Sequence, residues 1–356
     1  MRLLRLTIFL IIILAVCICG CTGPSPSPVP GPAAPAGSTT STASGTWTFV
    51  VYGDTRDDMN TTTGISPVLR PIALAIAAEK PDFILFDGDL ITGRVMNNNS
   101  PMVNNYTGQF GNWMEAVSPI HNYSTGTGIP IYVIRGNHED GYADHPLPAI
   151  LEAYLATVAS GMPTNGPPGE EKLTYSFTHK GAKFIAIDEY IPHNGIKNTV
   201  NQSWVDGQLT QDTRPFMFVM GHSPAYYVSK DTHDIPTSLQ AQPAQRDIFW
   251  KSLADNHVLI YFCGHLHMYV RGESQGVQQV IGGNGGAPLL EFDPATVPPA
   301  LTLEYPLRAV VQSDQKFGYL VITVHEDSGT FEGVQKVLNP VTGAWETGDT
   351  FTMKAR

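Results

Sequence analysis

Residues 131–140 read Ile-Tyr-Val-Ile-Arg-Gly-Asn-His-Glu-Asp, and this stretch decides the fold. An apolar, β-branched run that stops at a glycine is typical of a strand buried on both faces of a parallel sheet. Gly136 allows a sharp turn, after which Asn137 and His138 present an amide oxygen and an imidazole. Open α/β sheets bind ligands at the carboxyl ends of their strands, so we expect a ligand site here. A polar loop that caps a helix is the alternative for this stretch alone.

Four more apolar runs end in the same way, with a glycine and then a polar side chain. The residues that follow these runs are Gly53-Asp54, Gly88-Asp89, Gly221-His222 and Gly264-His265-Leu266-His267. Carboxylate, amide and imidazole groups together make a hard-to-borderline set of metal ligands. Because the set contains no cysteine, a structural zinc site with thiolate ligands is excluded.

The number of candidate ligands favours two metal ions. The six are Asp54, Asp89, Asn137, His222, His265 and His267. One tetrahedral zinc ion binds only four ligands. Two ions about 3.5–4 Å apart that share a carboxylate would use all six. His265 and His267 share a face on an extended strand, but in a turn each could bind a different ion.

The spacing of apolar residues predicts an α/β fold. Residues 47–52 and 83–86 are apolar strands, and residues 67–79 between them have a helical pattern with Ser66 as a candidate N-cap. Strand, helix and strand in this order indicate a parallel sheet with right-handed crossovers. We place the folded domain at residues 46–338 and a C-terminal tail at residues 339–356.

The charge of the chain argues against nucleic acid as a partner. The 356 residues include 21 Lys and Arg and 32 Asp and Glu, so the net charge is 21 − 32 = −11. An acidic surface repels a phosphate backbone unless a local basic groove exists, and the sequence contains no such cluster. We therefore expect no nucleic-acid partner.

The first 45 residues are typical of export. Arg2 and Arg5 precede the apolar stretch 8–16, and Gly20-Cys21 resembles the lipobox of prokaryotic lipoproteins. We predict a signal peptide at residues 1–20, a lipid-carrying Cys21 that anchors the chain to the membrane, and a Pro/Ser/Thr-rich linker at residues 21–45. The domain would then lie outside the cytoplasmic membrane, at the cell surface or in the periplasm. A plain signal peptide and an uncleaved membrane anchor are the alternatives.

The glycine-preceded motifs stand in the order of the calcineurin-like metallophosphoesterase family, and the sequence resembles that family over residues 46–324. Purple acid phosphatases, phosphodiesterases and Ser/Thr protein phosphatases belong to it. The resemblance implies a four-layer α/β/β/α sandwich of two mixed sheets, with a dinuclear metal site at the carboxyl ends of the strands. It also implies an enzyme that hydrolyses phosphate mono- or diesters.

The resemblance also implies a role for each ligand. Asp54 and His267 would bind the first metal ion, and Asp89 would bridge the two ions. The remaining ligands of the second ion would be Asn137, His222 and His265. We expect Mn, Fe or Zn. A metal-bridging hydroxide would attack phosphorus, because bound water loses a proton more easily than free water. His138 would protonate the leaving alkoxide or stabilise the phosphoryl oxygens.

The sequence departs from the family at the first motif. Many members have Asp-x-His there, but the third residue here is Arg56. Thr92 stands where purple acid phosphatases have a tyrosine ligand, so an iron–tyrosinate chromophore is not expected. The first ion lacks one protein ligand, and water or Thr92 could replace it. Arg56 could bind the substrate phosphate as a forked donor, or it could pair with Asp57 or Asp58.

Other polar residues receive structural roles in this interpretation. Glu139 either orients an imidazole or caps a helix. The histidines outside the motifs are expected at the surface or in packing: His121, His145, His179, His193, His233, His257 and His325.

Two competing functions remain open. One is a metal-dependent nuclease, which would use the same centre. The other is a single-metal or non-catalytic phosphate-binding protein, in which Arg56 fills the first metal site with its own cation. The sequence predicts no oligomeric state.

Overall fold

The structure is a computed structural model, and it describes residues 45–141, 147–229, 232–233, 235–292, 294–305 and 316–355. The predicted signal peptide at residues 1–20, Cys21 and nearly all of the linker lie outside the described residues. No helix among the described residues is long and apolar enough to cross a membrane.

The first sheet contains six strands in the order β15-β14-β13-β1-β2-β5. Strands β1, β2 and the edge strand β5 are parallel, whereas β13, β14 and β15 continue the sheet in antiparallel pairs. The bounds are β1 Thr46–Tyr52, β2 Phe83–Phe86, β5 Ile131–Val133, β13 Gly318–His325, β14 Thr330–Leu338 and β15 Trp345–Lys354.

The second sheet contains seven strands in the order β12-β10-β11-β9-β8-β7-β6. Strands β11, β9, β8 and β7 are parallel, and antiparallel pairs close both edges. The bounds are β6 Tyr175–His179, β7 Ala182–Ala186, β8 Phe216–Met220, β9 Ile260–Cys263, β10 Tyr269–Ser274, β11 Val277–Gly282 and β12 Thr302–Tyr305. A short hairpin, β3 His121–Asn122 with β4 Thr127–Gly128, stands apart.

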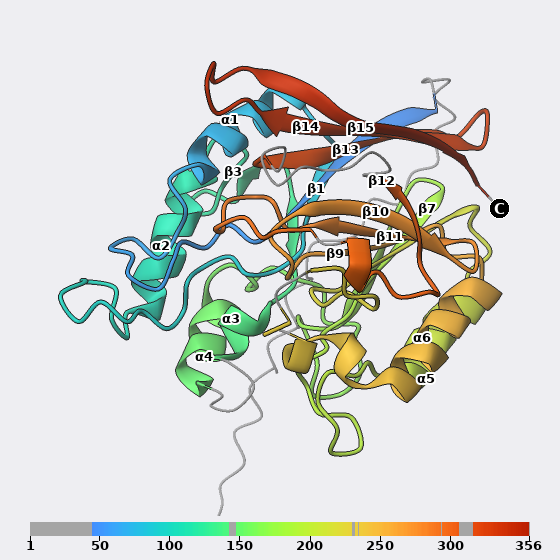
Figure 1. Cartoon of the computed structure of the whole chain (residues 1–356), viewed down its shortest axis with the longest axis horizontal. Helices are drawn as coiled ribbons and strands as arrows, with labels where there is room; N and C mark the ends of the chain where they lie inside the picture. The colour runs from blue at the N-terminus through green and yellow to red at the C-terminus, as the bar shows by residue number, and fades with distance from the viewer. Residues whose placement is uncertain are drawn as a thin grey trace, which may run out of the picture. The chain divides into compact units, whose positions relative to one another are not determined.

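Helices cover the outer faces of the two sheets (Figure 1). The α-helices are α1 Leu69–Glu79, α2 Tyr106–Ala116, α3 Asn137–Asp140, α4 Pro148–Ala156, α5 Gln202–Thr210 and α6 Pro243–Asp255, and the 3₁₀ turns are η1 Ile235–Thr237, η2 Leu239–Ala241 and η3 Pro294–Thr296. Side chains of α1, α2 and α4 pack on the first sheet, and those of α5 and α6 pack on the second.

An aromatic core joins the inner faces of the sheets. Phe49 of β1 stacks on Phe83 of β2 with ring centroids 5.4 Å apart, and it meets Phe184 of β7 edge-on at 5.3 Å. Offset-stacked and edge-on pairs of this kind add stability beyond the area they bury. Helix, sheet, sheet and helix therefore form four layers, which confirms the predicted α/β/β/α sandwich of two mixed sheets.

The sequence analysis missed two elements. It ended the domain at residue 338, but β15 at Trp345–Lys354 pairs with β14 and is part of the first sheet. It did not predict α5 at Gln202–Thr210. These segments are rich in polar residues and glycine, so their apolar periodicity is weak. Their structure is determined instead by pairing and packing against neighbouring strands and helices that are more apolar.

Candidate metal centre

The turns after five strands meet at one edge of the sandwich. The main-chain N–H of Asp54 after β1 donates to the carbonyl of Gly88 after β2, at 2.9 Å. The N–H of Gly264 after β9 donates to the carbonyl of His222 after β8, at 3.0 Å. The N–H of His265 donates to the Asp54 carboxylate at 3.0 Å and so links the two sheets. Side chains far apart along the chain are thus brought to one place.

Two of the glycines are required by close approach. A Cβ atom at Gly136 would overlap Oδ1 of Asp89, and one at Gly264 would overlap Oδ2 of Asp54. The sequence analysis attributed these glycines to tight turning. The structure adds that a carboxylate lies against each backbone: Asp89 from the neighbouring strand β2 against Gly136, and Asp54 from the other sheet against Gly264.

One half of the centre is a compact set of four donor atoms. Oδ1 of Asn137 lies 2.9 Å from Nδ1 of His265 and 3.1 Å from Nε2 of His222. Nε2 of His222 lies 3.5 Å from Oδ1 of Asp89. Two ligand atoms that bind one ion at about 2.1 Å are about 3.0–3.4 Å apart in octahedral or tetrahedral geometry. These donors therefore fit a single metal ion, and we call this set the second metal position.

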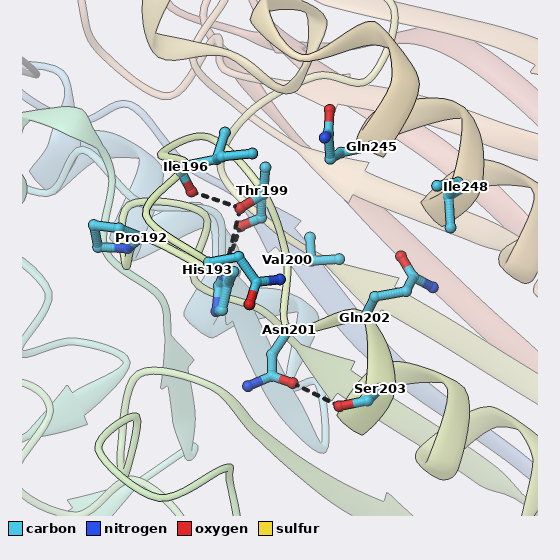
Figure 2. Close-up of a pocket in the computed structure, with 11 residues that line it drawn as sticks. Pro192, His193, Ile196, Thr199, Val200, Asn201, Gln202, Ser203, Gln245 and Ile248 are labelled. Carbon is cyan, nitrogen blue, oxygen red and sulfur yellow. Dashed lines mark hydrogen bonds between the residues drawn. The ribbon is translucent and has the colours of Figure 1, made fainter.

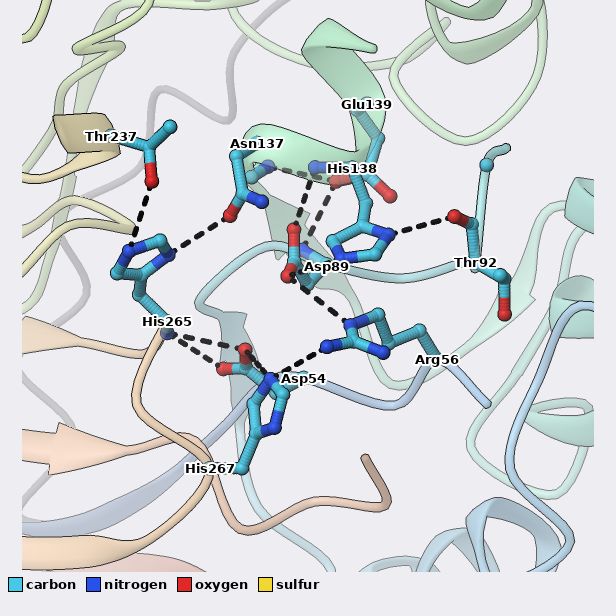
Figure 3. Close-up of polar contacts among 12 residues, drawn as sticks. Asp54, Arg56, Asp89, Thr92, Asn137, His138, Glu139, Thr237, His265 and His267 are labelled. Carbon is cyan, nitrogen blue, oxygen red and sulfur yellow. Dashed lines mark hydrogen bonds and ion pairs between the residues drawn. The ribbon is translucent and has the colours of Figure 1, made fainter. Parts of the chain in front are cut away.

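Hydrogen bonds to the far sides of the imidazoles orient them. Nδ1 of His222 lies 2.6 Å from the carbonyl oxygen of Asp87, so it donates there and leaves the Nε2 lone pair toward Asn137. Nε2 of His265 lies 3.3 Å from Oγ1 of Thr237 in η1 (Figure 3). Such contacts fix the ring and raise its basicity as a ligand. The sequence analysis missed Thr237, because nothing in its local pattern marks it.

The other half of the centre holds Asp54, Asp89 and His267, whose ligand atoms lie within 4.8 Å of one another. We call this set the first metal position. Nε2 of His267 lies 3.7 Å from Oδ1 of Asp54, and its Nδ1 lies 2.8 Å from the carbonyl oxygen of Pro288. Asp89 contacts both halves, as a bridging carboxylate would. All six predicted ligands are therefore brought together.

Arg56 extends into the first metal position (Figure 3). Its Nη2 lies 3.2 Å from Nε2 of His267, and its Nε lies 3.7 Å from Oδ2 of Asp89. Its Nη1 donates to the main-chain carbonyl of Asp57 at 3.1 Å. The acidic partner of the guanidinium is thus Asp89, and the ion pair with the Asp57 or Asp58 carboxylate considered above is not formed.

Thr92 does not take the place of a missing ligand. Its hydroxyl donates to the carbonyl of Asp57 at 3.1 Å and accepts from the N–H of Asp57 at 3.1 Å. Its carbonyl instead accepts from Nδ1 of His138 at 2.7 Å. This bond leaves the Nε2 lone pair of His138 toward the centre, 3.8 Å from Oδ2 of Asp89. Water and Thr92 were considered above as replacements for the missing ligand of the first ion. The hydroxyl of Thr92 is thus bonded to Asp57 instead.

Glu139 ties two turns of the centre together. Its buried carboxylate accepts the N–H groups of Asp89 at 3.0 Å, Leu90 at 2.9 Å, Ile91 at 3.2 Å and Gly136 at 2.7 Å. Asp89 has a φ of 53°, a left-handed conformation that is unfavourable for a side-chain-bearing residue. Four hydrogen bonds from main-chain N–H groups offset this strain. Glu139 therefore positions Asp89 and, through the N–H of Gly136, caps α3 as considered above, rather than orienting an imidazole.

The electrostatics of the centre favour a bound cation. Burial raises the pKa of Asp54 well above its ordinary value, and nearby Asp89 raises it further. Burial acts in the same direction on Asp89, but His138, His222 and Arg56 lower the pKa of Asp89 below its ordinary range. Burial lowers the pKa of His222 to about 4, so its lone pair is available at neutral pH. Buried carboxylates beside neutral imidazoles are a donor set that fits metal ions.

A cavity of about 250 Å³ opens onto both metal positions. Its wall includes His233, which the sequence analysis assigned to the surface or to packing. His233 belongs to a loop after β8, and only the fold of that loop brings it to the centre. His145, another histidine with a predicted structural role, lies outside the described residues.

A larger cavity of about 570 Å³ lies elsewhere, between residues 192–203 and helix α6 (Figure 2). Its polar groups bond mainly to one another: Nδ1 of His193 lies 3.2 Å from Oγ1 of Thr199, and Ser203 donates to Asn201 at 3.2 Å. The described residues that line it include one histidine and no carboxylate. The smaller cavity is therefore the candidate active site.

Comparison with known proteins agrees with this geometry. The sequence profile of the calcineurin-like phosphoesterases matches residues 48–269, more than half of the chain. The chain belongs to the calcineurin-like phosphoesterase family. It is thus a metallophosphoesterase, in a family whose members use dinuclear metal centres. A comparison with curated protein sequences finds no match.

Solved structures of this family have the same fold. The purple acid phosphatase from yellow lupin (Lupinus luteus) seeds is 18% identical with a TM-score of 0.62, over 88% of this chain and 54% of the lupin chain. PhoD is 14% identical with a TM-score of 0.58, over 87% and 70% of the two chains. GAP50, the anchor in the inner membrane complex of Plasmodium, is 15% identical with a TM-score of 0.51, over 87% and 89%. At these identities the likeness concerns the fold alone.

Proposed function

We propose that this metallophosphoesterase hydrolyses a small phosphate mono- or diester with two metal ions, Mn, Fe or Zn. The observation that carries the proposal is the convergence of six oxygen and nitrogen donors from five strand ends, four of which (Asp89, Asn137, His265 and His267) line one cavity of about 250 Å³. When bound, the cations lower the pKa of water and neutralise charge on the phosphoryl oxygens. A cavity of this size suits a small substrate.

The side chains of the chain supply the remaining chemistry. Asp89 would bind both ions, and Glu139 fixes the backbone from which its carboxylate projects. His138 presents Nε2 toward the cavity, and burial lowers its pKa to about 4, so only its imidazolium form can donate a proton to the leaving oxygen or a hydrogen bond to a phosphoryl oxygen. Arg56 lines the same cavity and can pair with the substrate phosphate as a forked donor.

The proposal includes export and a lipid anchor on Cys21. Its support is the pair Arg2 and Arg5, the apolar stretch 8–16, and the Gly20-Cys21 step, followed by a Pro/Ser/Thr-rich stretch whose composition suits a linker. The full chain should incorporate labelled palmitate and sediment with membranes, whereas Cys21→Ser should do neither. Sedimentation of that variant with membranes would indicate an uncleaved anchor instead.

A single-metal phosphate-binding protein is the second candidate, and one observation favours it. The guanidinium of Arg56 lies where the first ion would bind, 3.2 Å from Nε2 of His267. A nuclease has less support, because the chain has a net charge of −11.

The test combines metal content with turnover. The purified protein is stripped with a chelator, reloaded with Mn, Fe or Zn, and assayed with p-nitrophenyl phosphate and bis(p-nitrophenyl) phosphate. We expect two ions per chain and hydrolysis of at least one ester, both abolished by chelation. Less than one ion per chain with both esters intact would reject the proposal, and one ion with phosphate binding but no turnover would support the second candidate.

A further inference from the structure

The first metal position differs from the second in what its donors contact. In the second position Asn137, His222 and His265 present their donor atoms to one another, at separations of 2.9 and 3.1 Å. In the first position His267 and Asp89 face the guanidinium of Arg56 (Figure 3). One half of the centre is thus ready for a cation, and the other already contains a positive charge.

Arg56 uses the lone pair that a metal ion would need. Nδ1 of His267 lies 2.8 Å from the carbonyl oxygen of Pro288 and so carries the ring proton. Nε2 is therefore the unprotonated nitrogen, and it accepts from Nη2 of Arg56 at 3.2 Å. A single lone pair cannot both accept this hydrogen bond and bind a metal ion. The two interactions exclude each other.

The charge of Arg56 acts in the same direction. Its Nε lies 3.7 Å from Oδ2 of Asp89. The guanidinium thus already pairs with a carboxylate that would bind the first ion. A cation that enters this position while Arg56 remains there meets a like charge a few ångströms away, in a site shielded from water.

We propose that Arg56 is a resident counter-cation of the first metal position, and that it must swing away before this position can bind a metal ion. The inference rests on the proposed dinuclear function. The centre then loads in two steps, with tight binding at the second position and weaker binding at the first. Because Arg56 also lines the cavity, the displaced guanidinium stays within reach of a substrate phosphate. Arg56 would therefore regulate the metal content of the enzyme.

The test is a calorimetric titration of the chelator-stripped full chain with Mn²⁺. It measures how many ions each chain binds and how tightly, and it needs no activity assay. Wild type should bind one ion tightly and another weakly, and Arg56→Gln should bind the weak ion at least about tenfold more tightly. The matched control is Arg70→Gln, since Arg70 lies on α1, is half exposed and bonds to Ser118. It should titrate as wild type does.

Electron paramagnetic resonance of Mn²⁺ on wild type gives a second readout that needs no variant. One equivalent should give the six-line signal of an isolated ion, and a spin-coupled signal should appear only with excess metal. Two equally tight ions in wild type and Arg56→Gln would overturn the role of Arg56 and leave the proposed function intact. Absence of bound metal from both proteins would overturn both.

Discussion

Two buried clusters of charged side chains in this protein differ in whether they contain their own counter-charge. In one, Arg135 after β5 donates to Asp140 at 2.9 Å and to Asp188 after β7 at 3.2 Å. Lys197 lies 3.7 Å from the other oxygen of Asp140. Two carboxylates thus face two cationic side chains, and the cluster, which we call the Arg135 cluster, joins the two sheets.

The metal centre lies close by and also joins the two sheets, but its charges are less evenly matched. Asp54 and Asp89 are buried, and the guanidinium of Arg56 is the cation that faces them. Burying an ion costs several kcal/mol unless a partner compensates it. The comparison teaches that the Arg135 cluster contains its own counter-charges, whereas the proposed metal centre would be completed by cations from solution.

The largest effect is expected from Asp89→Asn, which removes the carboxylate shared by both halves of the metal centre. We expect kcat/KM for the preferred phosphoester to fall by roughly 10³-fold or more and the bound metal to drop below two ions per chain. Steady-state kinetics and metal analysis measure these effects. The control is Asp247→Asn on α6, where the aspartate is exposed and bonds to Arg246. Retention of two ions and most of the activity would contradict a bridging role.

Arg135→Ala should convert the matched cluster into an unmatched one. We expect the free energy of unfolding to fall by about 3–5 kcal/mol, because two buried carboxylates lose their cation. Burial already raises the pKa of Asp140, and in the variant a protonated carboxyl is easier to bury, so the loss should shrink toward acidic pH. Urea unfolding across pH measures this.

The double variant Arg135→Met with Asp188→Leu serves as the comparison for that experiment. Because it removes the cation together with one of the buried anions, it should recover part of the lost stability. If the double variant is as unstable as Arg135→Ala, lost packing explains the effect better than uncompensated charge.

Glu139→Gln should loosen the metal centre and keep the fold. An amide group offers one acceptor oxygen and directs an NH₂ group at main-chain N–H donors, so it cannot replace the four hydrogen bonds of the carboxylate. We expect metal affinity to fall by about 10- to 100-fold, as for other groups that support metal ligands. Calorimetric titration measures it, with Glu171→Gln on the exposed loop before β6 as control. Unchanged affinity would show that Asp89 holds its conformation without Glu139.

The smallest effect is expected at Asp82, before β2. Its carboxylate accepts from the N–H of Thr48 at 3.2 Å and lies 3.1 Å from His179 and 3.3 Å from Lys180. Burial works against these contacts, but together they lower the pKa of Asp82. Asp82→Asn should therefore cost up to about 1 kcal/mol at neutral pH.

The effect at Asp82 should depend on pH in a defined direction. A lowered folded-state pKa means that the stabilisation is present above the ordinary pKa of an aspartate and is lost as the pH falls through the folded value. Wild type and variant should therefore converge in acid. A difference in unfolding free energy that persists at pH 2 would show that charge is not its source.

Most candidate ligands of the metal centre could be predicted from the residues next to them in the sequence. A glycine followed by Asp, Asn or His after an apolar run has a local physical cause, since the chain must leave the sheet sharply and present a donor at once. The four-layer fold followed from the same strands through family resemblance. The polar strand β15 was not recognised, because it owes its place to pairing with β14 and to the bond between Arg271 and Asp349, two residues far apart along the chain.

The sequence by itself determined which side chains are candidate metal donors and where each strand ends, because both depend on neighbouring residues. Only the tertiary structure decided that Arg56 enters the first metal position, that Glu139 locks Asp89, and that Thr237 and His233 reach the centre. These contacts join turns and loops separated by tens to hundreds of residues. Their geometry depends on how two whole sheets pack, which no local pattern encodes.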